Sequence, residues 1–436
     1  MDVAVGLALQ DISFLLFLSY LSSTPFAFLE LTTNQGEAMK SLFGCLLVLA
    51  GTFLPVAIAP AAPATQARPV HIGLDLEYGH ATSTSDDAIT LGAEIAVEEI
   101  NRAGGVLGGR PLAIIKKDNR SVPARARANI EELARTPDVV AVFTGKFSPV
   151  ALEVLPLVHQ LKMPLLGTWG AADGIIDNGY MPNYAFRLSM RDTWAMNHML
   201  DAARQAGQKR FGLLLPNTSW GRSNLKAAEN YVRRQTDMQL VSTQWYNWGD
   251  ASLMKPYRDI LDKGADVLIL VANEKEGSLL VKEMAALPKA QRRRVISHWG
   301  VTGGNFAELA GPALQQIDFS VVQTFTFIGK ENRKAQALAA EAVRRLQLKT
   351  AEDLPSPVGI AHAYDLVHVL ALALGRAGST DREAVRDALE NVRNYDGAIK
   401  RYDRPFTRDR HEALSETDLF LARFLPDGSI HPIRKP

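Results

Sequence analysis

Short apolar runs alternate with segments of helical periodicity along most of this chain. Residues 70–76, 112–116 and 139–143 are apolar runs of strand length, and helix-spaced apolar residues separate each run from the next. The alternation begins again near Met196 and continues to Phe325. Strands that alternate with helices are joined by crossovers and are typical of parallel sheets. The sequence therefore predicts an α/β fold built from two successive modules.

The chain beyond the second module also carries regular patterns. Helical periodicity covers residues 332–346, 359–375 and 381–392, and the second of these segments has one wide apolar face. A tail of strand-like residues follows, in which Asp427-Gly428 is a typical turn between two strands. This part of the sequence predicts three more helices and a final pair of strands.

The first 67 residues differ in composition from the rest of the chain. Their only charged residues are Asp2, Asp11, Glu30, Glu37 and Lys40. Two apolar runs, residues 12–29 and 42–59, are each long enough to cross a bilayer. The segment therefore indicates either an export signal or a genuine amino-terminal membrane segment.

The second apolar run favours the export signal. Met39-Lys40 supplies a start and a positive charge, residues 46–54 an apolar stretch, and residues 62–67 a cleavage region of small residues. We therefore predict that translation begins at Met39. Residues 1–67 are then a mis-assigned leader followed by a signal peptide, and the mature protein begins at about residue 68.

Composition excludes several classes of function. The 48 basic and 47 acidic residues nearly cancel, whereas a nucleic-acid-binding chain is usually strongly basic. The single cysteine, Cys45, excludes an internal disulfide, a cysteine-based zinc site and an iron–sulfur cluster. It lies within the predicted signal, beside Phe43 where a lipidation signal would have a small residue. We predict a periplasmic protein without cofactor, bound metal or nucleic-acid partner.

Tryptophan positions give the strongest indication of a binding site. All six tryptophans fall near expected strand ends, in loops or at helix starts: Trp169, Trp194, Trp220, Trp245, Trp248 and Trp299. Rings gathered at one rim of two sheets would line an aromatic cleft. Trp169, Trp220 and Trp299 are the best candidates, and the alternative is that several of the six pack beneath loops as ordinary core residues.

The loop after residues 139–143 is a candidate carboxylate site. Ser148 is suited to cap the next helix, and Pro149 to occupy the first helical position. Backbone amides at the start of a helix attract anions, and Lys146 adds a positive charge to the same loop. The alternative is that Ser148 only caps its helix.

The ordered motifs from about residue 70 to residue 430 resemble a known family. The motifs are residues 95–110, Asp118, residues 145–148, Met163-Pro164, Phe186-Arg187 with Asp192, Trp220-Gly221, Ala363-Tyr364-Asp365 and Ala377-Gly378-Ser379. Together they resemble the type I periplasmic binding proteins, specifically the leucine/isoleucine/valine-binding family of ABC-transporter substrate-binding proteins.

This resemblance implies two Rossmann-like lobes with parallel central sheets, joined by three crossovers near Met190, Thr326 and Asp396. Lobe 1 would comprise residues 68–190 and 327–395, and lobe 2 residues 191–326 and 396–436. A ligand would be clamped between the closing lobes and delivered to the permease subunits of an ABC importer. The resemblance implies no catalysis, and we expect a monomer.

The predicted ligand-binding residues combine the resemblance with the loops described above. They are Tyr78, Lys146, Phe147, Ser148, Thr168, Trp169, Asp192, Trp220, Asn273, His298 and Trp299.

Two loops depart from the pattern of the family members that bind amino acids. Val301 stands where those members usually carry an acidic residue for the ligand ammonium, and Asn273 and Glu274 stand where an aromatic residue is usual. A buried cationic group without a counter-charge is costly. The departure favours an apolar or aromatic carboxylate, although Asp192 or Glu274 leaves an amino acid open.

Two other functions remain as alternatives. A periplasmic ligand sensor for a signalling or regulatory partner would use the same fold. An enzyme is disfavoured because the sequence contains no nucleophile elbow, His-Glu-x-x-His motif or phosphate-binding loop.

Overall fold

The computed structural model describes residues 67–80 and 83–433. The predicted leader, the start at Met39 and the signal peptide fall on residues 1–66, which lie outside the described residues. The fold is described here only as far as it positions the candidate site.

The first sheet contains five parallel strands in the order β2-β1-β3-β4-β5. Their bounds are Val70–Leu76 for β1, Leu112–Asp118 for β2, Val139–Thr144 for β3, Leu165–Gly167 for β4 and Ala185–Arg187 for β5. The central strand β3 is buried along its whole length, as expected for an apolar strand covered by helices on both faces. Strands β1, β2 and β3 were each predicted within two residues of these bounds.

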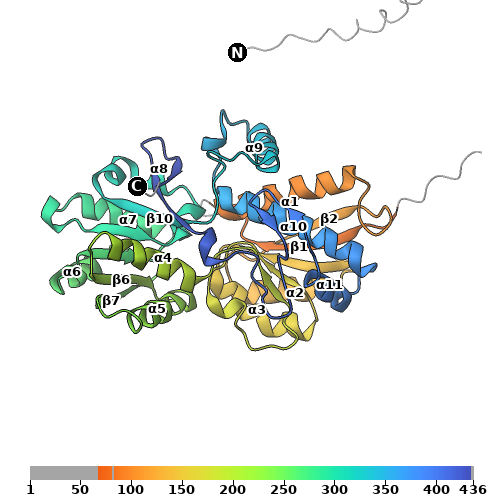
Figure 1. Ribbon diagram of the computed structural model, residues 1–436, viewed down its shortest axis with the longest axis horizontal. Coiled ribbons are helices and arrows are strands. Elements are labelled where there is room, and N and C mark those ends of the chain that lie inside the picture. Colours follow the sequence, from red (N-terminus) through yellow and green to blue (C-terminus); the bar gives the residue numbers. More distant parts are fainter. Residues whose placement is uncertain (1–66, 81–82, 434–436) are drawn as a thin grey trace, which may run out of the picture. The chain divides into compact units, whose positions relative to one another are not determined.

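Helices from both ends of the described chain cover this sheet (Figure 1). They are α1 (Thr84–Arg102), α2 (Pro123–Arg135), α3 (Ser148–Gln160), α10 (Pro357–Ala377) and α11 (Arg382–Leu389). Helices α1 and α10 pack so closely that a Cβ atom on Gly92 would lie 2.1 Å from the Ile360 carbonyl oxygen. The close approach explains why α1 has a glycine in its interior.

Helix α10 is the one helix of the described residues that is long and apolar enough to cross a membrane. Its apolar stretch is 78% buried within the protein. The burial is that of a central core helix, which contacts α1 on one side and α11 on another.

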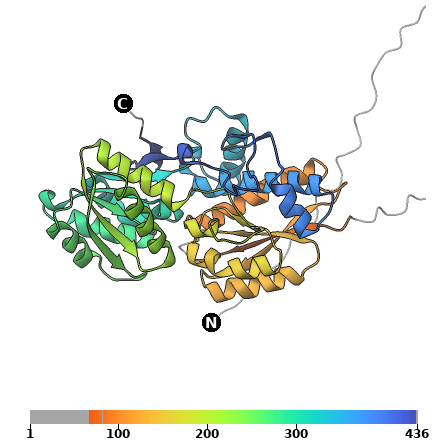
Figure 2. The same ribbon diagram turned by 60° about the horizontal axis from the view of Figure 1, so that its bottom comes forward.

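The second sheet has seven strands in the order β14-β13-β10-β9-β8-β6-β7. Its green strands lie at the left of Figure 2, and the orange and yellow strands of the first sheet lie at the right. The bounds are Arg210–Pro216 for β6, Gln239–Tyr246 for β7, Val267–Leu270 for β8, Arg294–Ser297 for β9, Phe319–Gln323 for β10, Phe420–Phe424 for β13 and Ile430–Pro432 for β14. Strands β6 to β10 are parallel, as predicted. Strands β13 and β14 are antiparallel because the predicted turn at Asp427-Gly428 joins them as a hairpin.

Several helices connect the strands of the second sheet. They are α4 (Asp192–Gln205), α5 (Ser219–Val232), α6 (Met254–Asp262), α7 (Glu274–Ala285) and α8 (Phe306–Ala310). A short 3-10 helix, η3 (Trp299–Gly303), follows β9 and was not predicted. Helix α9 (Arg333–Leu346) follows β10 and contacts α1.

A two-stranded sheet, β11 (Tyr395–Asp396) with β12 (Arg401–Tyr402), is anchored to α10. The buried Asp365 carboxylate of α10 accepts hydrogen bonds from the Tyr402 hydroxyl and from the Ala398 amide. Further on, Glu412 pairs with Arg187 of β5. The chain therefore still contacts the first sheet at Glu412, whereas the predicted boundary between the lobes is at residue 396. The division into lobes stays a prediction.

Candidate ligand-binding site

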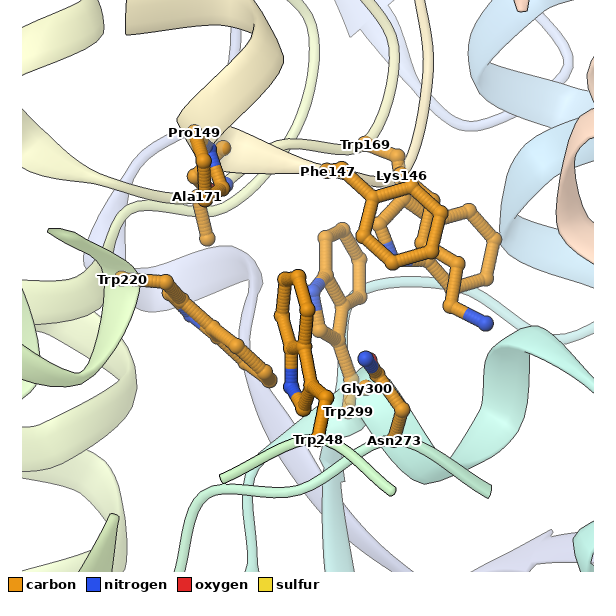
Figure 3. Close-up of a pocket in the computed structure, with 11 residues that line it drawn as sticks. Lys146, Phe147, Pro149, Trp169, Ala171, Trp220, Trp248, Asn273, Trp299 and Gly300 are labelled. Atoms are coloured by element: carbon orange, nitrogen blue, oxygen red, sulfur yellow. The ribbon is translucent and has the colours of Figure 1, made fainter. Parts of the chain in front are cut away.

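One pocket gathers loops from the carboxyl ends of strands in both sheets (Figure 3). Its lining residues are Lys146, Phe147, Ser148, Pro149, Trp169, Ala171, Trp220, Trp248, Asn273, Trp299 and Gly300. Ligands of α/β proteins bind at this edge of a sheet because the helix amino termini point there. Seven of the eleven predicted ligand-binding residues line the pocket.

Four of the six tryptophans line this pocket, including the three favoured from the sequence. The rings of Trp169 and Trp299 lie 5.0 Å apart at an interplanar angle of 34°, although one follows β4 and the other β9. Phe147 meets Trp248 edge-on, with ring centroids 5.5 Å apart. Figure 3 shows the Trp248 and Trp299 rings directed into the same space as Phe147 and Trp220. These contacts join loops of the two sheets through aromatic rings.

Aromatic side chains occupy most of the space between these loops. The free volume for the centre of a water-sized sphere is about 10 Å³, roughly the room that one water molecule needs. Trp169 and Trp299 are each 1% exposed. A solute of the size of an amino acid must therefore displace rings or separate the loops to enter.

Trp220 owes its position to the glycines around it. A Cβ atom on the next residue, Gly221, would lie 2.0 Å from the Pro216 carbonyl oxygen, so only glycine lets α5 begin this close to β6. A Cβ atom on Gly300 would lie 2.6 Å from the Trp220 ring. The outer edge of the ring therefore lies against the backbone of η3 on the second-sheet side of the pocket.

Ser148 lines the pocket but does not cap its helix, and its contact with a ligand stays a prediction. The structure begins α3 at Ser148, the capping position belongs to Phe147, and the serine side chain caps no amide of its own helix. Its hydroxyl oxygen instead accepts hydrogen bonds from the amides of Ala171 and Ala172, at 3.1 and 3.2 Å. The prediction of a helix cap was wrong because the loop after β4, distant in sequence, supplies the donors. Ser148 thus lies beside two backbone donors at the pocket wall.

Lys146 lines the pocket but its charge is paired. The Lys146 ammonium lies 2.6 Å from the Glu274 carboxylate, and both side chains are 2% exposed. Glu274 is the first residue of α7, on the second sheet, whereas Lys146 follows β3 of the first. The pair thus joins loops of the two sheets beside the pocket.

Asp86 of α1 forms hydrogen bonds with the backbone of the loop that contains Lys146. This carboxylate accepts hydrogen bonds from the amides of Lys146 and Glu77, at 3.2 and 2.8 Å. Burial is the main influence on its titration and raises the pKa of Asp86 to about 7. Asp86 thus supports the loop at the pocket.

Asp192 and His298 lie behind Trp220 and do not line the pocket. Asp192 accepts a hydrogen bond from the Trp220 indole nitrogen at 3.1 Å, and His298 Nε2 lies 3.1 Å from the same carboxylate oxygen. Both side chains are fully buried. The second Asp192 oxygen and His298 Nδ1 have no protein partner within the described structure. These residues position Trp220 in the present arrangement.

Tyr78 and Thr168 lie apart from the pocket lining. The Tyr78 hydroxyl accepts a hydrogen bond from Thr90 of α1, at 3.3 Å. The Thr168 hydroxyl donates to the Thr144 carbonyl oxygen at 2.8 Å and so joins the ends of β3 and β4. Their predicted contact with a ligand stays a prediction.

His362 of α10 is buried on the other side of the Trp169 loop. Its Nδ1 lies 2.9 Å from the Thr168 carbonyl oxygen, and its Nε2 lies 3.0 Å from the Thr324 hydroxyl oxygen. A carbonyl oxygen can only accept, so Nδ1 carries the proton and neutral His362 accepts from Thr324. Burial lowers the pKa of His362 to about 4.

This neutral histidine predicts a pH dependence of stability. The unfolded chain binds a proton at His362 below about pH 6.5 and the folded chain only below about pH 4. The contribution is therefore complete above pH 6.5 and decreases as the pH falls to 4, by up to roughly 3 kcal/mol. The variant His362→Asn offers a similar donor and acceptor without titrating. We expect the stability advantage of the natural protein over this variant, measured by urea unfolding, to shrink between pH 7.5 and pH 4.5. An advantage that is equal at both values would contradict this assignment.

Among the described residues there is no group of three or more histidine, cysteine, aspartate or glutamate side chains arranged to hold a metal ion.

The pocket also includes residues that were not predicted. Pro149, Ala171 and Gly300 contribute mainly backbone and small side chains, for which the sequence pattern gives no signal. Trp248 lies in a turn after β7 and is 37% exposed, yet its ring lines the pocket. Its place near a strand end was a usable signal, but nothing in the sequence ranked it above Trp194 or Trp245.

Comparisons with known proteins agree with this architecture. The family described as periplasmic binding proteins matches residues 69–428. A curated relative, Leu/Ile/Val-binding protein homolog 7 of Brucella abortus (strain 2308), is 24% identical over 241 residues. That alignment covers 53% of this chain and 59% of the relative, so the chain spans little more than half the length of the curated relative it matches.

Two solved structures share the fold across nearly all of the described residues. A type 1 periplasmic binding protein from Bordetella pertussis Tohama I has a TM-score of 0.76 at 20% identity, covering 84% of this chain and 100% of that chain. An ABC-transporter solute-binding protein from Rhodopseudomonas palustris, in complex with benzoate, has a TM-score of 0.68 at 18% identity, covering 84% and 95%. The predicted α/β architecture is confirmed.

Proposed function

Because this chain belongs to the periplasmic binding protein family, we propose that it is the extracytoplasmic solute-binding component of an ABC importer. The family consists of binding proteins, and the chain is not an enzyme. In the proposed cycle, one small solute enters between two lobes, the lobes close, and the closed form docks on permease subunits of the membrane. The protein is exported to the periplasm by its signal peptide and acts there as a monomer.

The ligand that the pocket supports best is a small carboxylate with an aromatic or apolar body. The observation that carries this proposal is the set of four tryptophans beside the Ser148 hydroxyl, whose oxygen accepts from the amides of Ala171 and Ala172 and whose own hydrogen can be donated to a ligand. Indole faces suit a flat apolar group, whereas a hydroxyl donor suits a carboxylate. A micromolar affinity requires about 8 kcal/mol, which such a combination can supply.

The comparisons support both members of the proposed ligand class. The Rhodopseudomonas palustris protein was solved with benzoate, an aromatic carboxylate. The curated relatives carry the name Leu/Ile/Val-binding protein homolog 7. An amino acid therefore remains the second candidate, but the position of Val301 and the pairing of Glu274 with Lys146 favour the simple acid.

A thermal-shift screen of the exported protein tests the proposal. The panel contains benzoate, 3-phenylpropanoate, 4-methylpentanoate, leucine and phenylalanine. At a hundred times the dissociation constant a ligand adds about 2.7 kcal/mol of stability, which raises Tm of a chain of this size by about 3–4 °C. We expect the aromatic acids to give the largest shifts. A panel in which no carboxylate changes Tm would contradict the proposed function.

A further inference from the structure

The Lys146–Glu274 ion pair places charged groups at the lining of the pocket. Among the described residues that line the pocket, Lys146 alone carries a formal charge. Its partner Glu274 follows directly after Asn273, which also lines the pocket. The ammonium and carboxylate lie 2.6 Å apart, and neither side chain is more than 2% exposed. The Glu274 carboxylate is therefore already occupied by the lysine charge.

Two neighbouring glycines enclose this pair. A Cβ atom on Gly303 would lie 2.9 Å from Lys146 Cε, and one on Gly304 would lie 2.5 Å from Glu274 Cγ. The backbone at the end of η3 and just beyond it thus lies directly against both side chains, which are 2% exposed. A buried ion pair without water interacts strongly, and removal of one partner leaves an uncompensated charge in place.

Asp192 does not provide a second carboxylate in the pocket lining. One of its oxygens already accepts the Trp220 indole N–H, and the residue lies behind that ring. An ammonium group that uses Glu274 as its counter-charge must therefore compete with Lys146 for it. A carboxylate does not meet this difficulty, because it needs no negative partner and can accept the hydroxyl hydrogen of Ser148.

We propose that the Lys146–Glu274 ion pair is a charge filter, which admits carboxylates that lack an α-amino group and rejects α-amino acids. The inference rests on the proposed function and names the substrate class of the same pocket. The filter acts by keeping Glu274 neutralised, so that an added α-amino group finds no counter-charge. The ion pair is thus a specificity determinant, in addition to joining the loops of the two sheets.

Two pairs of ligands, whose members differ only by the α-amino group, measure the effect of that group on binding. Phenylalanine differs from 3-phenylpropanoate only by this group, and leucine differs in the same way from 4-methylpentanoate. The measured quantity is the ratio of the two dissociation constants within a pair, obtained by calorimetric titration. We expect the natural protein to favour the acid by at least about tenfold in whichever pair fits the pocket.

Two single variants should move this ratio in opposite directions. Lys146→Met leaves the Glu274 carboxylate unpaired, so the ratio should shift at least about tenfold toward the amino acid. Glu274→Gln removes the negative charge that pairs with Lys146, so the ratio should shift further toward the acid. The double variant, with both charges removed, should lie between the two single variants. Lys255→Met, which removes an exposed ion pair with Asp259, is the control and should leave the ratio unchanged.

The outcomes separate the filter from the proposed function. A purely structural role of the ion pair would weaken both ligands of a pair equally and leave the ratio unchanged, which would overturn the filter. Tight binding of leucine or phenylalanine by the natural protein would overturn it as well, while the solute-binding function would stand. If no member of either pair binds, the proposed function and the filter both fail. If Lys146→Met does not fold, the Glu274→Gln ratio decides alone.

Discussion

Replacing Arg187 by alanine should lower the free energy of unfolding by about 3–5 kcal/mol, the usual cost of breaking a buried ion pair. The Arg187 guanidinium is fully buried and pairs with Glu412 through two hydrogen bonds of 2.9 and 2.5 Å. It also donates to the carbonyl oxygens of Gly170 and Ala172, at 3.2 and 2.9 Å. One side chain thus joins β5, the loop after β4 and the segment that leads to β13.

The same substitution should impair ligand binding. The loop that Arg187 holds contains Ala171, which lines the pocket and donates its amide hydrogen to Ser148. Urea unfolding measures the stability, and titration with the best ligand of the thermal-shift screen measures binding at a temperature where the variant is folded. Arg204→Ala removes an exposed arginine paired with Asp237 and is the control. A loss below about 1 kcal/mol, as for exposed ion pairs, would contradict this role of Arg187.

Removal of the Trp169 or Trp299 ring should weaken ligand binding by about 2–4 kcal/mol, or roughly 30- to 1000-fold. Both rings are nearly completely buried, and they meet at the centre of the pocket from different sheets. A central aromatic residue that excludes water contributes far more to affinity than a residue at the rim.

Matched variants separate a loss of ligand binding from a loss of folding. Trp169→Phe retains an aromatic ring and should lose less affinity than Trp169→Ala. Trp245→Ala removes a ring that is 37% exposed and is stacked by Arg222 outside the pocket lining, so affinity should change less than about twofold. Titration calorimetry measures each affinity, and circular dichroism confirms folding. Equal losses for Trp169→Ala and Trp245→Ala would contradict the proposed site.

The sequence predicted most elements of the fold because periodicity is a local property. Strand β1 was predicted with its observed bounds, and the long helix α10 was recognised by its wide apolar face. The antiparallel strand β13 pairs with β10, almost a hundred residues earlier, and such a pairing leaves no local pattern. The short helix η3 has no apolar period of its own, since buried neighbours determine its conformation.

The site was predictable to the extent that it depends on the carboxyl ends of strands. Trp169, Trp220 and Trp299 were identified because each follows an expected strand. The role of Ser148 was not identified, because its hydrogen-bond donors come from a separate loop. The pairing of Lys146 with Glu274 joins residues 128 positions apart, and only the packing of both sheets brings them together.

Fluorine NMR of the protein labelled with 5-fluorotryptophan tests the central claim most directly, because each of the six tryptophans reports its own surroundings. Assignment uses single Trp→Phe variants, and the added ligand is the best carboxylate of the thermal-shift screen. At saturation we expect the resonances of Trp169, Trp220, Trp248 and Trp299 to move, while those of Trp194 and Trp245 stay nearly unchanged. Shifts confined to Trp194 and Trp245, with the other four unchanged, would place the ligand elsewhere and contradict the account.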